Sequence, residues 1–464
     1  MSSAASRETS PVTVIIPHFN DSHDLERTLP TWLEQTRPPR QIIVLDDGSS
    51  PEHLERLKRC VPDDPRYQVY LSPQNQGVNA LCMLGIGMAT QEYVVLMGCD
   101  DWAMPLFLEK CVGQLDLHPQ APFVFVDRFL HHIREDFLQP EKNYWRAESG
   151  YLTPEEFADV LHGTHFRATA PVWRKSRIAE IGFDEEMKWF ADSYATFLLG
   201  AMEGCCHVPL TLNVFGLRPN SYHKVGQKSK RSENALRTML HKIVAPERAA
   251  LLPFFIHAGF FNWIRDDFVR YMAYHPEDWC PEALALLQQP QVLHFGGRVP
   301  QADMSREQLN REDIQRAQAA LERAQALLNA GDIAGARKAL EAGVALYPHI
   351  AAFRSGLADL LESTGHPAEA ARHLRQLFRL ETSRAEILAR WARAEEKAGL
   401  DQLVPFLAAH LERCPNDGTS AGFYFDLLSR RGLVQEALHF AENRPELHPQ
   451  AAELLKGRAA LNPA

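Results

Sequence analysis

The chain has 464 residues, 45% of them hydrophobic and 23% charged, which suits a globular protein of two or three domains. Its net charge of −10 argues against non-specific nucleic-acid binding, which needs a basic surface. The eight cysteines show neither CxxC pairs nor zinc-ligand spacing, so we expect reduced thiols. The polar start does not resemble a signal peptide, and no apolar run has the length of a membrane span. These features predict a cytoplasmic protein.

Strand-like and helix-like segments alternate over residues 12–130. The apolar run Val12–Ile16 predicts a strand that is buried on both faces. Asp21 is expected to cap the following helix, which carries a stripe of leucines. The alternation predicts an α/β fold with a mostly parallel, Rossmann-like sheet and right-handed crossovers. Further strands are expected at residues 42–45, 67–71 and 93–97.

Two acidic pairs each follow a predicted strand: Asp46-Asp47 after the second and Asp100-Asp101 after the fourth. Open α/β sheets bind ligands at the carboxyl ends of their strands. The two pairs together therefore predict one site for a nucleotide diphosphate and its metal. Each acidic pair, taken alone, also has a simpler structural explanation. The first fits an ordinary Asp-Gly turn, and the second fits two aspartates that cap a helix near Pro105.

Four motifs stand in a fixed order between residues 11 and 225: VTVIIPHFN, VLDDGSS, NQGVNALCMLGIGMATQEYVVLMGCDD and GFDEEMKWFADSYATFLLGAMEG. Their order and spacing resemble those of the family 2 glycosyltransferases, which have the GT-A fold. The resemblance implies an inverting, metal-dependent enzyme that moves a sugar from a nucleotide-sugar donor to a glycan or protein acceptor. A UDP-sugar is the first expectation for the donor, and bacterial surface polysaccharide synthesis or protein glycosylation is the expected setting.

The resemblance also implies how the donor is held. Asp47 matches the aspartate that hydrogen-bonds the donor base, and Pro17 and Phe19 match positions that flank the nucleotide. Asp100 and Asp101 match the aspartates that hold Mn²⁺ or Mg²⁺ on the diphosphate, and Asp100 is also expected to contact the donor. Hard oxygen ligands suit both ions. Which of the two aspartates binds the metal directly stays open.

Two further matches concern catalysis. Asp192 matches the family's catalytic base, which takes a proton from the acceptor hydroxyl. His223 matches a position that reaches the metal or the diphosphate. The sequence departs from the family pattern at Gly98, where D-x-D-D has an aspartate, and at Ala191, where E-D has a glutamate. The simpler alternatives are a helix-capping role for Asp192 and an ordinary surface position for His223.

Residues 231–300 are interpreted as a helical extension of the catalytic domain, which itself is expected at 11–230. An aromatic segment at 251–264 could touch a membrane surface peripherally. It lacks a strongly basic polar face, so we expect it to pack against the rest of the protein instead.

Residues 312–464 change to a composition rich in Ala, Leu, Arg and Glu. Glycines between helix-like segments recur every 33–34 residues, and a matching alanine follows three of them. This period resembles the tetratricopeptide repeat, a helix–turn–helix unit that buries its apolar face against its neighbours. The repeats are expected to bind a protein partner or acceptor, or to form a homo-oligomer. An unrelated helical bundle is the alternative. The recurring glycines are Gly331, Gly365, Gly399 and Gly432.

Two other functions are alternatives to sugar transfer. Nucleotidyl transfer would require a glycine-rich, basic loop after the first strand, where this chain has Pro17-His18-Phe19-Asn20. The second alternative is a scaffold whose glycosyltransferase-like domain is inactive. Gly98 and Ala191 favour the scaffold, whereas the four aspartates matched above favour the enzyme.

Overall fold

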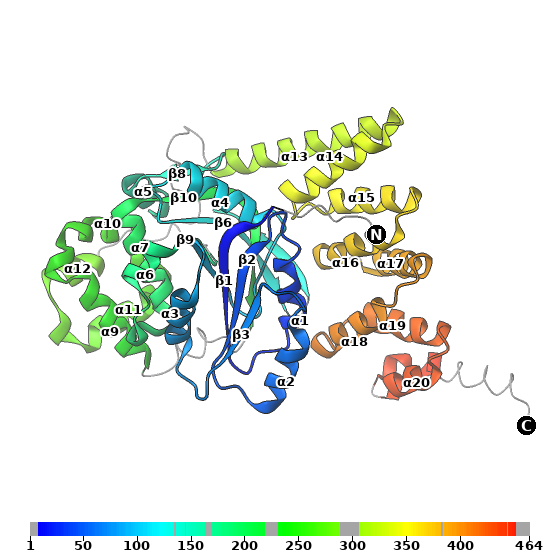
Figure 1. Cartoon of the computed structure of the whole chain (residues 1–464), viewed down its shortest axis with the longest axis horizontal. Coiled ribbons are helices and arrows are strands. Elements are labelled where there is room, and N and C mark those ends of the chain that lie inside the picture. The colour runs from blue at the N-terminus through cyan, green and yellow to red at the C-terminus, as the bar shows by residue number, and fades with distance from the viewer. Residues whose placement is uncertain are drawn as a thin grey trace, which may run out of the picture. The chain divides into compact units, whose positions relative to one another are not determined.

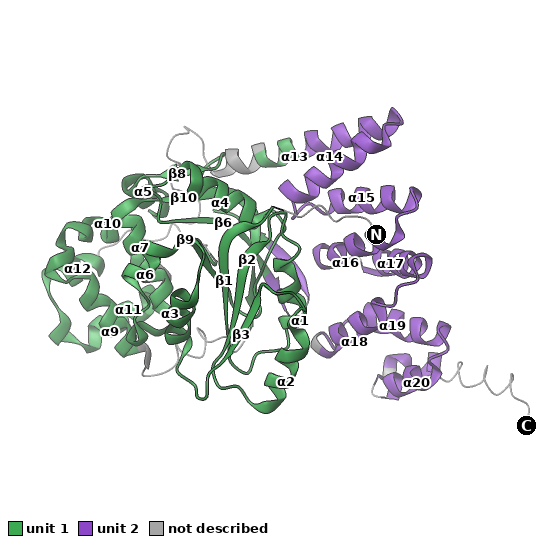
Figure 2. Cartoon of the chain, viewed as in Figure 1, with its two compact units in different colours: residues 1–130, 140–317 green, residues 131–139, 318–464 purple. Residues whose placement is uncertain are grey.

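The computed structural model describes residues 8–133, 136–143, 145–162, 169–218, 231–287, 306–381, 384–442 and 444–451. The chain divides into two compact units (Figure 2). Unit 1 comprises residues 1–130 and 140–317, and unit 2 comprises residues 131–139 and 318–464. Over the described ranges, no helix combines the length and the apolar character that crossing a membrane requires.

A ten-stranded mixed sheet lies mostly in unit 1 (Figure 1), and its residues 131–132 and 137–139 belong to unit 2. Its order is β3-β2-β1-β4-β9-β6-β10-β5, with β7 added to β6 and β8 added to β10. The strands are β1 (Ser10–His18), β2 (Pro39–Asp46), β3 (Tyr67–Leu71), β4 (Tyr93–Leu96), β5 (Trp102–Ala103), β6 (Phe123–His132), β7 (Phe137–Glu141), β8 (Gly150–Leu152), β9 (Val172–Arg174) and β10 (Cys205–Leu217).

The strand pairing confirms the predicted α/β class. Strands β3, β2, β1 and β4 are parallel neighbours, as the alternation of strand-like and helix-like segments predicts. The pairs β4–β9, β6–β9, β10–β5 and β10–β8 are antiparallel, so the sheet is parallel on one side and antiparallel in these pairs on the other. Strand β9 has only three residues, which is too short for an apolar pattern to reveal.

The helices that accompany the sheet differ from expectation at the first crossover. Asp21 does not cap a helix: α1 begins at Leu25, its N-cap residue is Asp24, and no side chain caps it. After one turn the chain tightens into a 3-10 helix that contains Pro30, a residue without a backbone donor. The helices are α1 (Leu25–Thr28), η1 (Leu29–Trp32), α2 (Pro51–Cys60), α3 (Val78–Met88), α4 (Phe107–Leu117), α5 (Pro154–Leu161), α6 (Lys175–Ile181), η2 (Glu185–Phe190) and α7 (Ala191–Glu203).

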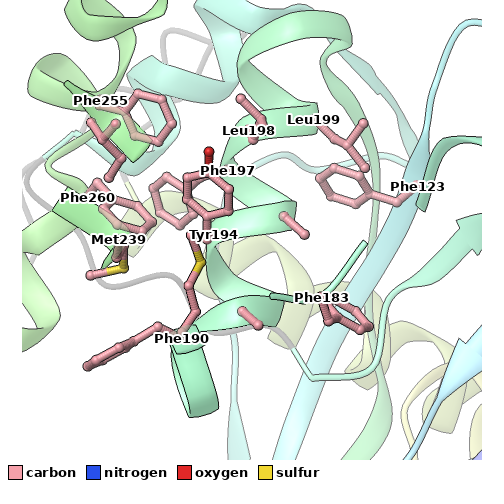
Figure 3. Close-up of a cluster of buried hydrophobic side chains, with 14 of the residues drawn as sticks. Phe123, Phe183, Phe190, Tyr194, Phe197, Leu198, Leu199, Met239, Phe255 and Phe260 are labelled. Atoms are coloured by element: carbon pink, nitrogen blue, oxygen red, sulfur yellow. The ribbon is translucent and has the colours of Figure 1, made fainter. Parts of the chain in front are cut away.

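The aromatic segment at 251–264 contributes to the hydrophobic core (Figure 3). The ring of Phe197 on α7 meets Phe260 edge-on at 4.6 Å between centroids, and Phe260 meets Phe255 in the same way at 5.4 Å. Both Phe255 and Phe260 are fully buried, so packing, not membrane contact, explains this segment. The helices of the described region 231–287 are α9 (Arg231–Ile243), η3 (Pro246–Leu251), α10 (Leu252–Ala258), η4 (Phe260–Ile264), α11 (Arg265–Tyr274), η5 (Pro276–Asp278) and α12 (Pro281–Leu287).

The C-terminal region is helical, as predicted. The four recurring glycines each lie between two helices, at φ values of 76°, 78°, 65° and 75°. Glycine adopts this left-handed conformation without the steric cost of a Cβ, which explains why it recurs at the turns. The helices are α13 (Arg306–Asn329), α14 (Ile333–Leu346), α15 (Ala351–Ser363), α16 (Pro367–Leu380), α17 (Arg384–Ala398), α18 (Leu403–Arg413), α19 (Gly418–Arg430), α20 (Val434–Glu442) and η6 (Pro445–Leu447).

A buried ionic network in unit 2 centres on Asp136, in the segment between β6 and β7. Asp136 Oδ1 lies 2.7 Å from His131 Nε2 and 3.1 Å from Arg379 Nε, and Asp136 Oδ2 lies 3.6 Å from His410 Nδ1. All four side chains are at most 3% exposed. Burial alone would raise the pKa of Asp136, but the charge of Arg379 and the hydrogen bond from His131 hold it well below its usual range. The segment 131–139 is therefore an integral part of unit 2.

Replacing Asp136 with alanine is expected to lower the free energy of unfolding by about 3–5 kcal/mol, because it leaves Arg379 buried without its carboxylate. Denaturant titration of the full chain measures this loss. Asp401→Ala is the matched control, since Asp401 is exposed and its ion pair with Arg431 is worth about 1 kcal/mol at most. Equal losses in the two variants would show that the buried network does not stabilise unit 2.

Candidate functional site

The carboxyl ends of β1 and β2 bring His18 and Asp46 together in register. Asp46 Oδ1 lies 2.7 Å from His18 Nδ1, while its Oδ2 accepts the backbone N–H groups of Gly48 at 3.1 Å and Ser49 at 3.0 Å. Burial lowers the pKa of His18 and outweighs the opposing effect of Asp46. The ring is therefore neutral at neutral pH and donates its Nδ1 proton to Asp46. This pair fixes the turn after β2, a role that the sequence analysis did not assign.

Asp47 fastens that turn to the loop before α3. It is 3% exposed, and its two carboxylate oxygens accept the backbone N–H groups of Gln76 at 2.7 Å and Gly77 at 2.9 Å. A carboxylate offers about four lone-pair positions, so these two bonds leave capacity for a ligand. Pro17 is half-buried nearby in β1, and Phe19 is 48% exposed. The expected contacts of these three residues with a nucleotide stay predictions.

Asp100 and Asp101 meet Gly216 of β10. The backbone N–H of Gly216 donates to Asp101 Oδ1 at 2.8 Å, and a Cβ on Gly216 would lie 2.8 Å from Asp100 Oδ2. Only glycine permits this close approach. A Cβ on Gly98 would lie 3.2 Å from Asp101 Oδ2 and 3.3 Å from Asp100 Oδ1, so both carboxylates border the same small space. An aspartate at position 98 would add a third carboxyl group there.

Burial raises the pKa of both aspartates. The pKa of Asp101 lies well above its usual range, because burial and then the charge of Asp100 oppose its ionisation. The pKa of Asp100 is also raised by burial, against the opposing charge of Arg218. A cation bound beside the buried Asp101 and the partly buried Asp100 would favour the charged form of both carboxylates.

Arg218 is the cation that the described residues do provide. Its guanidinium pairs with Asp21 and Asp24 and lies 3.0 Å, through Nε, from Asp100 Oδ2. Burial would lower the pKa of Arg218, but the surrounding carboxylates outweigh this and raise it. The sequence analysis missed this role, and it misread Asp21 as a helix cap. Arg218 and Asp21 lie 197 positions apart, so no local pattern links them.

Asp100 and Asp101 supply only part of the ligand set that a divalent ion needs. Within the described residues, the one three-ligand group of metal-binding geometry is His275, Glu277 and Asp278, of which Asp278 also pairs with Arg237. Mg²⁺-like ions commonly take one or two carboxylates and complete their shell with waters and substrate phosphates. Asp100 and Asp101 match that ligand set. His223 lies outside the described residues.

Asp192 lies in the first turn of α7. Its side chain is exposed to solvent, and the surrounding protein raises its pKa by desolvation. Its Oδ1 accepts the backbone N–H of Ser193 at 2.6 Å. The charge of Asp192 also adds to burial in raising the pKa of Cys82 to about 12, which places Asp192 near α3.

The segment before Asp192 is held by α3 as well. Asn79 donates from Nδ2 to the carbonyl oxygens of Asp184 and Lys188, each at 2.9 Å. Lys188 has φ 51°, a conformation that a non-glycine residue adopts only under constraint. Asn79 stands two residues after Gly77, which binds Asp47. The first turn of α3 thus connects the Asp47 turn with the segment that carries Asp192.

Comparisons with known proteins agree with the predicted family. Residues 13–176 match the model of Glycosyl transferase family 2. An uncharacterized glycosyltransferase of Haemophilus influenzae is 27% identical over 99 residues, covering 21% of this chain and 40% of that protein. Chondroitin synthase of Escherichia coli is 25% identical over 186 residues, covering 40% of this chain and 26% of that protein. The chain therefore spans less than half the length of these relatives.

Two solved structures are also similar to the chain. S. aureus TarS 1-349, in complex with UDP-GlcNAc, has a TM-score of 0.45 at 14% identity and covers 60% of this chain and 81% of that one. The mannosyltransferase PcManGT from Pyrobaculum calidifontis, in complex with GDP-Man and Mn²⁺, has a TM-score of 0.40 at 18% identity, covering 62% of this chain and 82% of that one.

Proposed function

We propose that this protein is a metal-dependent glycosyltransferase that moves a sugar from a nucleotide-sugar donor, a UDP-sugar first of all, to a hydroxyl group of a glycan or protein acceptor. The family match over residues 13–176 supports the reaction class. The observation that carries the proposal is the pair Asp100 and Asp101, whose carboxylates border one small space beside Gly98 and Gly216 and whose pKa values are raised by burial. Mn²⁺ or Mg²⁺ held there would neutralise the diphosphate and make it a better leaving group.

The other site residues act on the donor and the acceptor. Asp47, with Pro17 and Phe19, receives the donor base at the carboxyl ends of β1 and β2, where a charge-assisted hydrogen bond can discriminate between bases. Asp192 removes the proton of the acceptor hydroxyl while that oxygen attacks the anomeric carbon. Attack opposite to the departing diphosphate is a single displacement that inverts the anomeric configuration. A raised pKa suits a base that works near neutral pH.

The helical region supports a role in recognition. Paired helices joined by glycines every 33–34 residues suit tetratricopeptide-like repeats, which present surfaces for peptides, acceptors or a second copy of the chain. We place the domain boundaries at 11–230 for the transferase, 231–300 for the helical extension and 312–464 for the repeats. The composition suits action in the cytoplasm, in surface glycan synthesis or protein glycosylation.

A thermal-shift panel tests donor binding directly. UDP-, GDP-, CDP- and dTDP-sugars are each added to the full chain with and without Mn²⁺. One donor family is expected to raise the melting temperature by about 2–4 °C or more at 100 times its Kd, and chiefly when Mn²⁺ is present. If no donor raises the melting temperature, the result would favour the alternative function, a scaffold with an inactive glycosyltransferase-like domain.

A further inference from the structure

Unit 2 contains a buried guanidinium that has no ionic partner. Arg354 lies in the first turn of α15, is 7% exposed, and its Nε makes no hydrogen bond. In the part of the chain that the structure describes, no carboxylate forms an ion pair with it. Burial lowers the pKa of Arg354 only to about 10, so the side chain stays charged at neutral pH. A buried charge without a counter-charge is strongly unfavourable.

The carboxylates on α15 itself and on α16 are engaged by other arginines. Glu369 of α16 lies 2.7 Å from Arg337, and Asp359 of α15 lies 2.6 Å from Arg390. Glu362 is likewise bound to Arg390, at 3.0 Å. Each of these acidic groups thus already has a cation. Arg354 is thus left as a buried charge without an ion pair among the described residues of this part of unit 2.

The surroundings of Arg354 are electropositive. Burial, followed by the charges of Arg354 and Arg372, lowers the pKa of His373 on α16 to about 4. His373 is therefore uncharged at neutral pH and adds no further positive charge. The N-terminus of α15 carries the positive end of the helix dipole, and its N-cap residue, Ile350, has no side chain that could cap it. Helical side chains lean toward the N-terminus, so the charge of Arg354 and the helix dipole reinforce each other.

We propose that unit 2 binds an anionic group, a carboxylate or a phosphate, at Arg354 between α15 and α16. The guanidinium supplies paired N–H donors that match either anion, and the first turn of α15 adds backbone N–H groups. Bound there, the anion provides the counter-charge that the protein itself does not. In a helical repeat, such a site takes an acidic side chain or a phosphate of a binding partner. The site is separate from the acidic pair at Asp100 and Asp101 and does not depend on transferase activity.

The test compares the full chain with two variants, Arg354→Met and Arg393→Met. Methionine preserves much of the side-chain length without the charge, and Arg393 is an exposed arginine on α17 that serves as the control. Melting temperatures are measured in sodium chloride, sodium phosphate and sodium succinate at equal ionic strength. The wild type and Arg393→Met are expected to melt about 2 °C or more higher in phosphate or succinate than in chloride. A response to phosphate alone identifies a phosphate group, and a response to succinate identifies a carboxylate.

Arg354→Met is expected to lose this anion-dependent rise and, in chloride, to melt above the wild type because an unpaired buried charge has gone. Phosphate that binds elsewhere, including the donor site, raises the wild type and the variant equally and cancels in the comparison. The proposal is overturned if Arg354→Met keeps the full rise, or if the wild type melts at the same temperature in all three salts. Arg354→Lys retains the charge and is expected to retain part of the rise, which covers the case in which the methionine variant fails to fold.

Discussion

Replacing Asp192 with asparagine is expected to lower donor turnover by about 100- to 10,000-fold, the usual contribution of a general base. The asparagine keeps the size of the side chain and its ability to accept the Ser193 N–H, but it cannot take a proton. Donor affinity should stay close to that of the wild type. Nucleoside diphosphate release measures turnover, and calorimetric titration measures binding.

The pH profile sharpens this prediction. Burial raises the pKa of Asp192, and a base must be unprotonated, so wild-type turnover should rise with pH through that raised pKa. The asparagine variant should lack this acidic limb. Asp159→Asn is the matched control, because Asp159 is exposed and forms an ion pair with the exposed His257. Unchanged turnover, or an unchanged acidic limb, in Asp192→Asn would remove Asp192 from the role of base.

Replacing Asp101 with asparagine is expected to reduce Mn²⁺-dependent turnover by at least about 100-fold, because several kcal/mol of charge stabilisation depend on the metal. The side-chain oxygen can still accept the Gly216 N–H, so the local backbone should be preserved. Without metal or donor, the variant should melt no lower than the wild type, since it lacks one of two carboxylates whose ionisation burial opposes.

Loss of activity together with unchanged or higher stability is the pattern that separates a ligand from a structural residue. Asp64→Asn is the control, since Asp64 lies in a partly exposed pair with Arg66 on the same unit. Asp64→Asn should keep its activity. Full Mn²⁺ dependence in Asp101→Asn would contradict a metal role for Asp101.

The sequence predicts the parallel half of the sheet because strand-like and helix-like segments alternate along it. It also predicts which strand ends carry the acidic pairs, and the structure places Asp100 and Asp101 at the end of β4. The antiparallel half was not foreseen, since short strands such as β9 have no periodic signature. The same limit applies to the first crossover, where Pro30 converts an expected leucine-striped helix into two short turns.

Interactions across long sequence separations explain what the motifs missed at the site. Asp46 and His18 lie 28 positions apart and meet only because β1 and β2 are in register. Arg218 gathers Asp21, Asp24 and Asp100 from the other end of the domain. A local reading of Asp21 as a helix cap was therefore wrong. Likewise, no sequence pattern indicates that Asn79 holds the segment before Asp192.

In the helical region, too, locally repeated features could be predicted from the sequence and long-range contacts could not. Its turn glycines were predicted from their period, because every turn needs the same left-handed backbone. The membership of residues 131–139 in unit 2 has no such signal. It involves the buried Asp136, which meets Arg379 243 positions later in the sequence.

The most direct measurement is release of nucleoside diphosphate from a nucleotide-sugar donor by the full chain, followed with and without Mn²⁺. Wild-type protein should release the diphosphate from at least one donor only when Mn²⁺ is present, and Asp101→Asn should release it at least about 100-fold more slowly. Release from no donor, or equal release by the variant, would contradict metal-dependent transfer at Asp100 and Asp101.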